Sequence, residues 1–150
     1  MAKEIERKFL VNSDAWRRAA SGSEAIVQGY LARGDGVTVR IRIFEDARAV
    51  LTIKAGGTAF SRDEYEYEVP LEDGRELLAH AGQQVIAKRR YTVPYAGRDW
   101  EVDVFEGRHA GLVLAEIEME SEDARVELPD WVGKDVTGDE RYYNSALAGA

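Results

Sequence analysis

The sequence predicts a mainly β fold, α+β by a strict count of helices, in which about eight antiparallel strands close into a barrel. Most of the chain alternates apolar and polar residues with the period of two that is typical of half-buried strands. Turn-forming residues bound several of these runs, and only short helical segments lie between them. Closure of such a sheet would remove its exposed edges.

The alternation is cleanest after the turn Gly34-Asp35-Gly36, where apolar and polar residues exchange at every position through Ile43. A later run ends at Ala55-Gly56-Gly57, where glycine favours a loop, and another is stopped by Pro70. The predicted strands are Lys3 to Val11, Ala25 to Ala32, 37–43, 49–54, Arg62 to Val69, Val85 to Val93, Trp100 to Phe105 and Leu112 to Glu120.

Three short helices complete the prediction. Ser13 can cap a helix that carries Asp14 and Trp16. A second helix is expected from Glu72 to Ala81, although Gly74 inside it is unfavourable. The tail from Ser121 onward reads as irregular and ends in a short helix over 144–148.

Composition bounds the class of protein. A chain of 150 residues with 45% hydrophobic content fits one domain, residues 1–150. Its net charge of -8 argues against nucleic-acid and anionic-membrane partners, which select basic surfaces. The chain has no cysteine, which excludes disulfides and thiolate sites. With no signal peptide at the N-terminus and no apolar run of about 20 residues, we expect a cytoplasmic protein.

The polar faces of the predicted strands are almost entirely ionic. Carboxylates dominate the first and last strands, whereas cations dominate the middle ones. For any one strand, a solvated outer face would explain such a pattern. However, a solvated face would normally include Ser, Asn and Gln, and it would not separate the two signs by strand. These faces carry Glu4, Glu6, Lys8; Arg40, Arg42; Lys54; Arg62, Glu64, Glu66; Lys88, Arg90; Glu101, Asp103; Glu116, Glu118 and Glu120.

If this face points inward, the barrel is a tunnel that must be filled by water, counter-ions or ligand. Clustered carboxylates are the ligands that Mg²⁺ and Mn²⁺ accept. Arginine and lysine supply a complementary clamp for phosphate oxygens. A remaining carboxylate could orient or deprotonate an attacking water. The pattern therefore indicates a site for a metal-bound polyphosphate.

The same residues carry a resemblance to a known family. The segment Glu4-Ile5-Glu6-Arg7-Lys8 resembles the E-x-E-x-K signature at the start of proteins of the CYTH family, also called triphosphate tunnel metalloenzymes. The C-terminal segment 136–144 resembles the ending of the short bacterial tripolyphosphatase-like branch of this family. The further motifs follow in the family's order: Arg40-x-Arg42, Thr52-x-Lys54, Arg62-x-Glu64-x-Glu66, Lys88-x-Arg90, Glu101-x-Asp103 and Glu116-x-Glu118.

The resemblance implies an eight-stranded tunnel, a divalent metal and a role for each motif. The implied metal ligands are Glu4, Glu6, Glu116 and Glu118, with Asp103 nearby. The implied phosphate clamp is Lys8, Arg40, Arg42, Lys54, Lys88 and Arg90, with Arg62 in addition. Glu64 and Glu66 could position water or metal, and together with Lys8 they are the catalytic candidates.

The function expected from this site is hydrolysis of the terminal phosphoanhydride of tripolyphosphate, thiamine triphosphate or a nucleoside triphosphate. Two alternatives stay open: an adenylyl cyclase of the same family, and a non-catalytic polyphosphate-binding module. A P-loop is excluded because its motif is absent from the sequence.

Some residues are better explained by structure than by chemistry. His80 and His109 lack metal-ligand spacing and are expected at the surface or in loops. Trp16, Trp100 and Trp131 are expected to pack the fold. Tyr30 could face the tunnel. Because short helices would leave apolar outer faces uncovered, a homodimer is also expected.

Overall fold

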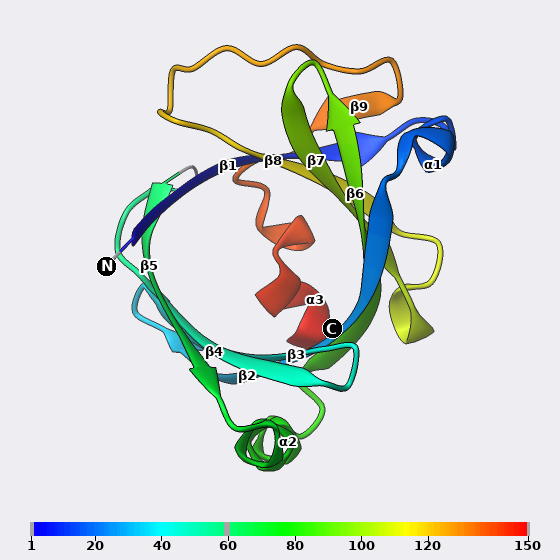
Figure 1. Ribbon diagram of the computed structural model, residues 1–150. Helices are drawn as coiled ribbons and strands as arrows, with labels where there is room; N and C mark the ends of the chain where they lie inside the picture. The colour runs from blue at the N-terminus through cyan, green and yellow to red at the C-terminus, as the bar shows by residue number, and fades with distance from the viewer. Residues whose placement is uncertain (1, 59–60, 150) are drawn as a thin grey trace.

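The computed structural model describes residues 2–58 and 61–149 and shows a closed barrel, viewed along its axis in Figure 1. Strands β1 to β8 form the barrel, a ninth strand lies outside it, and the helices are short. The elements are β1 (Ala2–Val11), α1 (Trp16–Ala19), β2 (Gly22–Gly34), β3 (Val37–Phe44), β4 (Arg48–Ala55), β5 (Ser61–Val69), α2 (Leu71–His80), β6 (Val85–Tyr95), β7 (Arg98–Phe105), the 3₁₀ turn η1 (Gly107–His109), β8 (Val113–Glu118), β9 (Val132–Asp135), the 3₁₀ turn η2 (Glu140–Tyr142) and α3 (Asn144–Gly149).

Strand β1 closes the barrel by pairing with two strands that are distant in sequence. Its first half pairs with β5, from Ala2 opposite Glu64 to Ile5 opposite Ser61. Its second half pairs with β8, from Glu6 opposite Glu118 to Leu10 opposite Leu114. The order around the ring is β1-β5-β4-β3-β2-β6-β7-β8, and every pairing is antiparallel. The predicted eight-stranded antiparallel barrel is confirmed.

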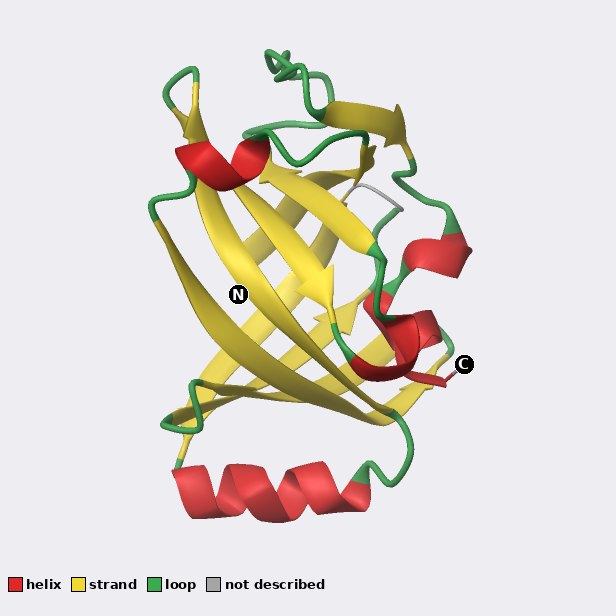
Figure 2. Ribbon diagram, turned by 90° about the vertical axis from the view of Figure 1, so that its right-hand side faces the viewer, coloured by secondary structure: helices red, strands yellow, loops and turns green. Residues whose placement is uncertain are grey.

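Apolar side chains on the outside of the barrel are covered by elements from the rest of the chain. Trp16, Trp100 and Trp131 belong to one buried cluster, which α1 and β9 help to enclose. On the opposite side, α2 lies against β2, β3 and β4 in both ribbon views (Figures 1 and 2). The prediction that the tryptophans pack the fold is confirmed.

Gly74 explains how α2 approaches the sheet so closely. A Cβ atom at this position would lie 2.4 Å from the Cβ of Ala49 on β4, far inside van der Waals contact. Glycine is therefore required by packing, and this requirement outweighs its low helix propensity. The residue that weakened the helix prediction is the one that lets the helix dock.

Two local predictions are wrong. The tail from Ser121 is not wholly irregular, because β9 pairs with β1 through Val132 opposite Val11. This four-residue strand is too short to show a clear period of two. Ser13 does not cap α1, since Ala15 occupies the N-cap position and the Ser13 hydroxyl accepts a hydrogen bond from the Ala15 amide at 3.3 Å. Asp14 consequently precedes the helix.

Within the described part of the chain, none of the helices has the length and apolar character needed to cross a bilayer. Among the residues that the structure describes, the large hydrophobic side chains that remain exposed are Val37, Tyr67, Tyr95 and Leu128. The outer faces are thus better covered than short helices alone would allow. The homodimer stays a prediction.

Candidate active site

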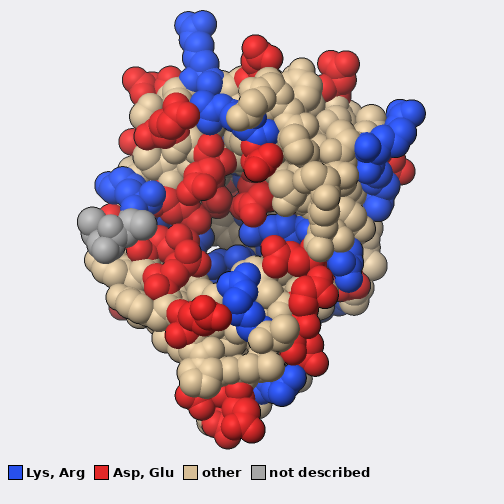
Figure 3. All heavy atoms as spheres, viewed as in Figure 1, with Lys and Arg blue, Asp and Glu red and all other residues tan. Residues whose placement is uncertain are grey.

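The inward faces of the strands enclose a cavity of about 290 Å³ that opens at one end of the barrel (Figure 3). Cα partners on neighbouring strands share a face, and the register places the charged residues together: Lys8 is opposite Glu116, Lys54 opposite Glu64, and Arg90 opposite Asp103. Every predicted site residue except Asp103 lines the cavity: Glu4, Glu6, Lys8, Arg40, Arg42, Lys54, Arg62, Glu64, Glu66, Lys88, Arg90, Glu116 and Glu118.

The two signs of charge occupy different walls. Most of the cavity glutamates come from the adjacent strands β8, β1 and β5, which form the acidic wall, and most of the arginines come from β3 and β6, which flank β2. Glu101 on β7 and Arg62 on β5 are the exceptions. Acidic atoms gather on one side of the opening and basic atoms on the other in Figure 3. This separation explains the strand-by-strand segregation of charge in the sequence, and it excludes a solvated outer face.

Arg40 and Arg42 are buried guanidinium groups that lack an acidic partner. They are 7% and 8% exposed, and no carboxylate of the described residues lies within ion-pair distance of either. Arg42 Nε donates to Gln28 Oε1 at 2.9 Å, and Arg40 Nη2 donates to Thr52 Oγ1 at 3.3 Å. Burial, with the adjacent charges of Arg40 and Arg90, lowers the pKa of Arg42 to about 9. An anion between the two guanidiniums would remove this electrostatic cost.

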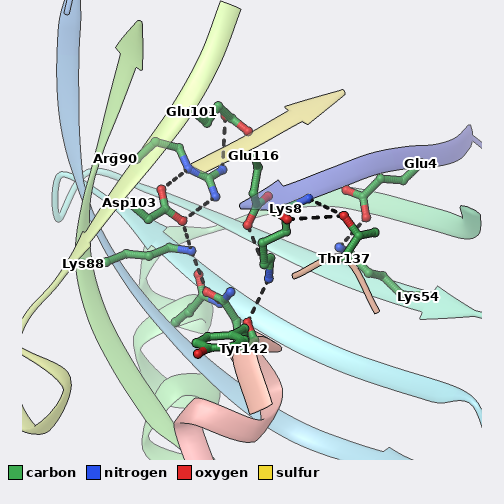
Figure 4. Close-up of polar contacts among 12 residues, drawn as sticks. Glu4, Lys8, Lys54, Lys88, Arg90, Glu101, Asp103, Glu116, Thr137 and Tyr142 are labelled. Carbon is green, nitrogen blue, oxygen red and sulfur yellow. Dashed lines mark hydrogen bonds and ion pairs between the residues drawn. The ribbon is translucent and has the colours of Figure 1, made fainter. Parts of the chain in front are cut away.

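Asp103 is the buried centre of an ion-pair cluster on β6 and β7 (Figure 4). It accepts hydrogen bonds from Arg90 Nε at 2.7 Å, Arg90 Nη2 at 2.9 Å and Lys88 Nζ at 2.7 Å. Burial would raise the pKa of Asp103, but the charges of Arg90 and Lys88 outweigh it and hold the pKa well below its ordinary value. Both oxygens are committed to cations, so these contacts favour a role in positioning the clamp over the implied role in metal binding.

Lys88 also differs from the simple clamp residue that the motif implies. Its side chain is fully buried, and Nζ donates to Asp103 and, at 2.7 Å, to Oδ1 of Asn144 at the start of α3. Burial lowers the pKa of Lys88, and the positive charges of Arg90 and Arg42 act in the same direction. A phosphate oxygen could reach this ammonium only by replacing one of its present partners.

On the acidic wall, some glutamates are neutralised by lysines and others are not. Lys54 Nζ lies 2.6 Å from Glu4 and 3.7 Å from Glu64, and Lys8 Nζ lies 3.6 Å from Glu116. Burial raises the pKa of Glu116, but the charges of Lys8 and Arg90 outweigh it and hold the pKa at about 2. This carboxylate stays ionised across the physiological range.

The pKa values of Glu6 and Glu64 are raised, whereas that of Glu116 is lowered. Burial raises the pKa of Glu6 well above its ordinary value, and the charges of Glu116 and Glu4 raise it further. Burial raises the pKa of Glu64 to about 7, together with the charge of Glu4 and a hydrogen bond to it. The acidic wall therefore holds more carboxylate charge than its two lysines compensate, which a divalent cation would correct.

Arg62 and Glu66 lie at the edge of the cavity. Arg62 donates to the backbone carbonyls of Gly36, at 2.9 Å, and Gly56, at 3.3 Å, so it supports two loops. Glu66 accepts a hydrogen bond from the Thr52 hydroxyl at 3.3 Å.

Sequence reasoning missed Gln28 and Asn144. Gln28 is fully buried, accepts from Arg42, and donates through Nε2 to the Tyr30 hydroxyl at 2.8 Å and to Asn144 Oδ1 at 3.3 Å. A polar residue two positions before Tyr30 in an otherwise apolar run was a usable signal. The part played by Asn144 had no local signal, because it depends on where α3 docks.

Fold and site together define a class: closed antiparallel barrels whose interior presents carboxylates to one side of a ligand and cations to the other. Residues 2–145 match the family model described as "CYTH domain". The chain therefore belongs to the CYTH family, and the resemblance seen in the ordered motifs is confirmed.

Two curated relatives span almost the whole chain. An inorganic triphosphatase from Acetivibrio thermocellus is 46% identical over 148 residues, covering 98% of this chain and 94% of the relative. An inorganic triphosphatase from Nitrosomonas europaea is 36% identical over 149 residues, covering 97% of this chain and 96% of the relative.

Solved structures agree with the fold. One inorganic triphosphatase structure superposes with a TM-score of 0.70 at 33% identity and covers 100% of this chain and 97% of its own. The HpAC1 protein from Hippeastrum, described as a candidate adenylyl cyclase with a dominant triphosphatase activity, gives a TM-score of 0.60 at 19% identity, covering 79% of this chain and 80% of its own. The latter similarity supports the fold alone.

Proposed function

We propose that this protein is a triphosphatase that uses Mg²⁺ or Mn²⁺ to hydrolyse the terminal phosphoanhydride of inorganic tripolyphosphate or a related triphosphate. The observation that carries the proposal is the buried pair Arg40 and Arg42, which has no carboxylate partner among the described residues and faces a wall of glutamates. The two curated relatives named inorganic triphosphatase support it.

The cations divide into two groups by their present contacts. Arg40 and Arg42 are the primary phosphate ligands, since their guanidinium groups can fork onto phosphate oxygens without breaking an ion pair. Lys8, Lys54 and Arg90 line the same cavity but are paired with carboxylates. They would contact a phosphate chain by sharing or exchanging those partners.

The residues on the acidic wall fit a divalent cation by their donor chemistry. Glu4, Glu6, Glu116 and Glu118 supply the hard oxygen atoms that Mg²⁺ and Mn²⁺ accept, and Glu6 has a strongly raised pKa that a cation would lower. In residues 2–58 and 61–149, no three acidic or imidazole side chains are already arranged to hold a metal. Mg²⁺ commonly takes its remaining ligands from water and substrate phosphates. When bound, the ion would neutralise charge on the phosphate oxygens.

A carboxylate of the acidic wall would accept the proton of the attacking water. Because the pKa of Glu64 is about 7, its carboxylate can accept a proton from water near neutral pH. Water then adds to the terminal phosphorus while the bridging P–O bond breaks, giving orthophosphate and pyrophosphate from tripolyphosphate. Arg40 and Arg42 stabilise the charge that develops on the phosphate oxygens. Lys8 lies beside Glu116 and can share that charge.

A phosphate-release screen tests the proposal. The purified protein is incubated with tripolyphosphate, thiamine triphosphate and ATP, each with Mg²⁺, with Mn²⁺ and with a chelator. We expect metal-dependent release from tripolyphosphate with a kcat/KM at least about tenfold above that for ATP, because an all-phosphate ligand can use every cation of the clamp. Cyclic AMP and pyrophosphate as the main products from ATP would establish the cyclase alternative, and binding without turnover would establish the binding module.

A further inference from the structure

Gln28 lies in the middle of the basic wall, the part of the tunnel formed by β3, β2 and β6, and carries no charge. The register places it directly opposite Arg42 on β3, and cross-strand partners of this kind have side chains in contact. The side chain of Gln28 is fully buried. Gln28 does not line the cavity, whereas Arg42 does. Any effect of Gln28 on a ligand must therefore pass through the residues that it contacts.

The contacts of Gln28 fix the orientation of its side-chain amide. Nε2 uses both of its hydrogens, because it donates to the Tyr30 hydroxyl at 2.8 Å and to Asn144 Oδ1 at 3.3 Å. The Asn144 atom must be an oxygen, since Lys88 Nζ, which can only donate, lies 2.7 Å from it. Arg42 Nε can also only donate. A flipped Gln28 amide would set its NH₂ group against this N–H, so the carbonyl oxygen is held toward Arg42.

The contact with Gln28 occupies one side of the Arg42 guanidinium and leaves the other side available. Arg42 Nε donates to Gln28 Oε1 at 2.9 Å. Within residues 2–58 and 61–149, Nη1 and Nη2 of Arg42 make no hydrogen bond, and neither nitrogen is fully enclosed. They are therefore open to the cavity that Arg42 lines. The two N–H groups on this terminal edge of a guanidinium match two oxygen atoms of one phosphate.

Arg90, on the same wall, is held in a different way. Asp103 accepts hydrogen bonds from its Nε and Nη2, and Glu101 accepts one from its Nη1 at 3.2 Å. All three nitrogens are thus bound, and two carboxylates compensate the charge. Arg42 has one neutral partner instead, which fixes the orientation of the guanidinium without cancelling its charge. A carboxylate at position 28 would supply the same acceptor but would form a buried ion pair with Arg42.

We propose that Gln28 is a positioning residue that holds Arg42 by Nε, so that Nη1 and Nη2 meet a phosphate group of the substrate with their positive charge uncompensated. This inference rests on the proposed function and extends it to a residue that does not touch the substrate. Because the guanidinium is oriented before the ligand arrives, binding does not have to order this long side chain. The same preorganisation favours the transition state, in which charge develops on the phosphate oxygens.

A double-mutant cycle on phosphate release from tripolyphosphate with Mg²⁺ tests whether Gln28 acts through Arg42. Gln28→Met, which keeps the length of the side chain but has no acceptor oxygen, should lower kcat/KM at least about tenfold. Adding Gln28→Met to Arg42→Met should change kcat/KM by less than about twofold, because no guanidinium is left to position. A further tenfold fall in the double variant would overturn the inference, as would an unchanged kcat/KM in Gln28→Met. Gln83→Met, the same exchange at an exposed glutamine outside the cavity, is the control and should have no effect.

The wild-type protein separates this inference from the proposed function. If the wild-type protein hydrolyses tripolyphosphate and Gln28→Met does so equally well, only the role of Gln28 is refuted. If the wild-type protein does not hydrolyse tripolyphosphate, the proposed function fails, and the role of Gln28 in that reaction fails with it.

Two further measurements keep the inference testable if Gln28→Met folds poorly or Arg42→Met is too slow to assay. The NMR signal of the Arg42 Nε–Hε group, assigned by its loss in Arg42→Met, reports the contact without turnover. Its hydrogen should exchange with solvent at least about tenfold faster in Gln28→Met than in the wild-type protein, and equal exchange would overturn the contact. Gln28→Glu keeps an acceptor for Arg42 but compensates its charge, so it should raise the KM for tripolyphosphate at least about tenfold. An unchanged KM in this variant would contradict the need for a neutral partner.

Discussion

Replacing Arg40 by methionine should separate catalysis from stability. In the free protein the guanidinium of Arg40 contributes little to stability. Its Nη2 donates a 3.3 Å hydrogen bond to Thr52, and its Nε has no partner. The charge of Arg40 also lowers the pKa of neighbouring Arg42. Methionine keeps much of the side-chain volume and removes the buried charge. Thr52 keeps its bond to Glu66. We therefore expect the free energy of unfolding to be unchanged or to increase.

The same change should severely impair turnover. A guanidinium that forks onto phosphate makes two charge-assisted hydrogen bonds, each contributing about 1.5–3 kcal/mol. Losing both costs about 3–6 kcal/mol of transition-state stabilisation, which corresponds to a fall of about 10² to 10⁴ in kcat/KM.

The assay pairs urea denaturation with phosphate release from tripolyphosphate. Arg18→Met on α1 is the matched control, since Arg18 is exposed and distant from the cavity, and it should alter neither measurement. A loss of stability parallel to the loss of activity would show that Arg40 supports the fold. An unchanged kcat/KM would refute its assignment to the phosphate clamp.

Four further predictions address the acidic wall, the ion-pair cluster and α2. Chelation should abolish phosphate release, and Glu6→Gln should nearly abolish it. Glu6→Gln should also raise the Tm of the metal-free protein, because it removes a buried carboxylate with a raised pKa; a lower Tm would contradict this. The folded protein keeps the Glu64 proton up to about pH 7, whereas the unfolded chain releases it near pH 4.5. The free energy of unfolding of the metal-free protein should therefore fall as the pH rises from about 4.5 to about 7. In urea denaturation, Glu64→Gln should reduce this dependence of the free energy of unfolding on pH. Asp103→Asn should lower the free energy of unfolding by about 3–5 kcal/mol, since two buried cations lose their shared carboxylate; a loss below about 1 kcal/mol would count against the cluster. Gly74→Ala should lower the free energy of unfolding by about 1–3 kcal/mol, and adding Ala49→Gly should recover part of that loss. No recovery in the double variant would show that the contact between α2 and β4 is not the reason for glycine at this position.

The barrel and the lining of its tunnel were predictable because both follow from local alternation. In a strand, residues two positions apart share a face, so Glu4, Glu6 and Lys8 had to point the same way. The near absence of neutral polar residues on those faces then indicated an enclosed site. Register between distant strands, such as β1 with β5, could not be read from alternation alone.

What the sequence could not predict depends on long-range contacts. Asp103 carries the same carboxylate as the glutamates of the acidic wall, yet pairing between β6 and β7 commits it to Arg90 and Lys88. Asn144 looked like the start of an ordinary terminal helix, and only its docking brings it to Lys88. A strand as short as β9 gives no periodic signal, so its pairing with β1 also appears only in the folded chain.

The most direct test of the central claim is phosphorus NMR of tripolyphosphate incubated with the purified protein and Mg²⁺. The account predicts that orthophosphate and pyrophosphate appear in equal amounts, that chelation stops the reaction, and that Arg40→Met slows it by about 10² to 10⁴ without loss of stability. Tripolyphosphate that remains intact with the folded, metal-loaded protein would contradict the assignment of this tunnel to triphosphate hydrolysis.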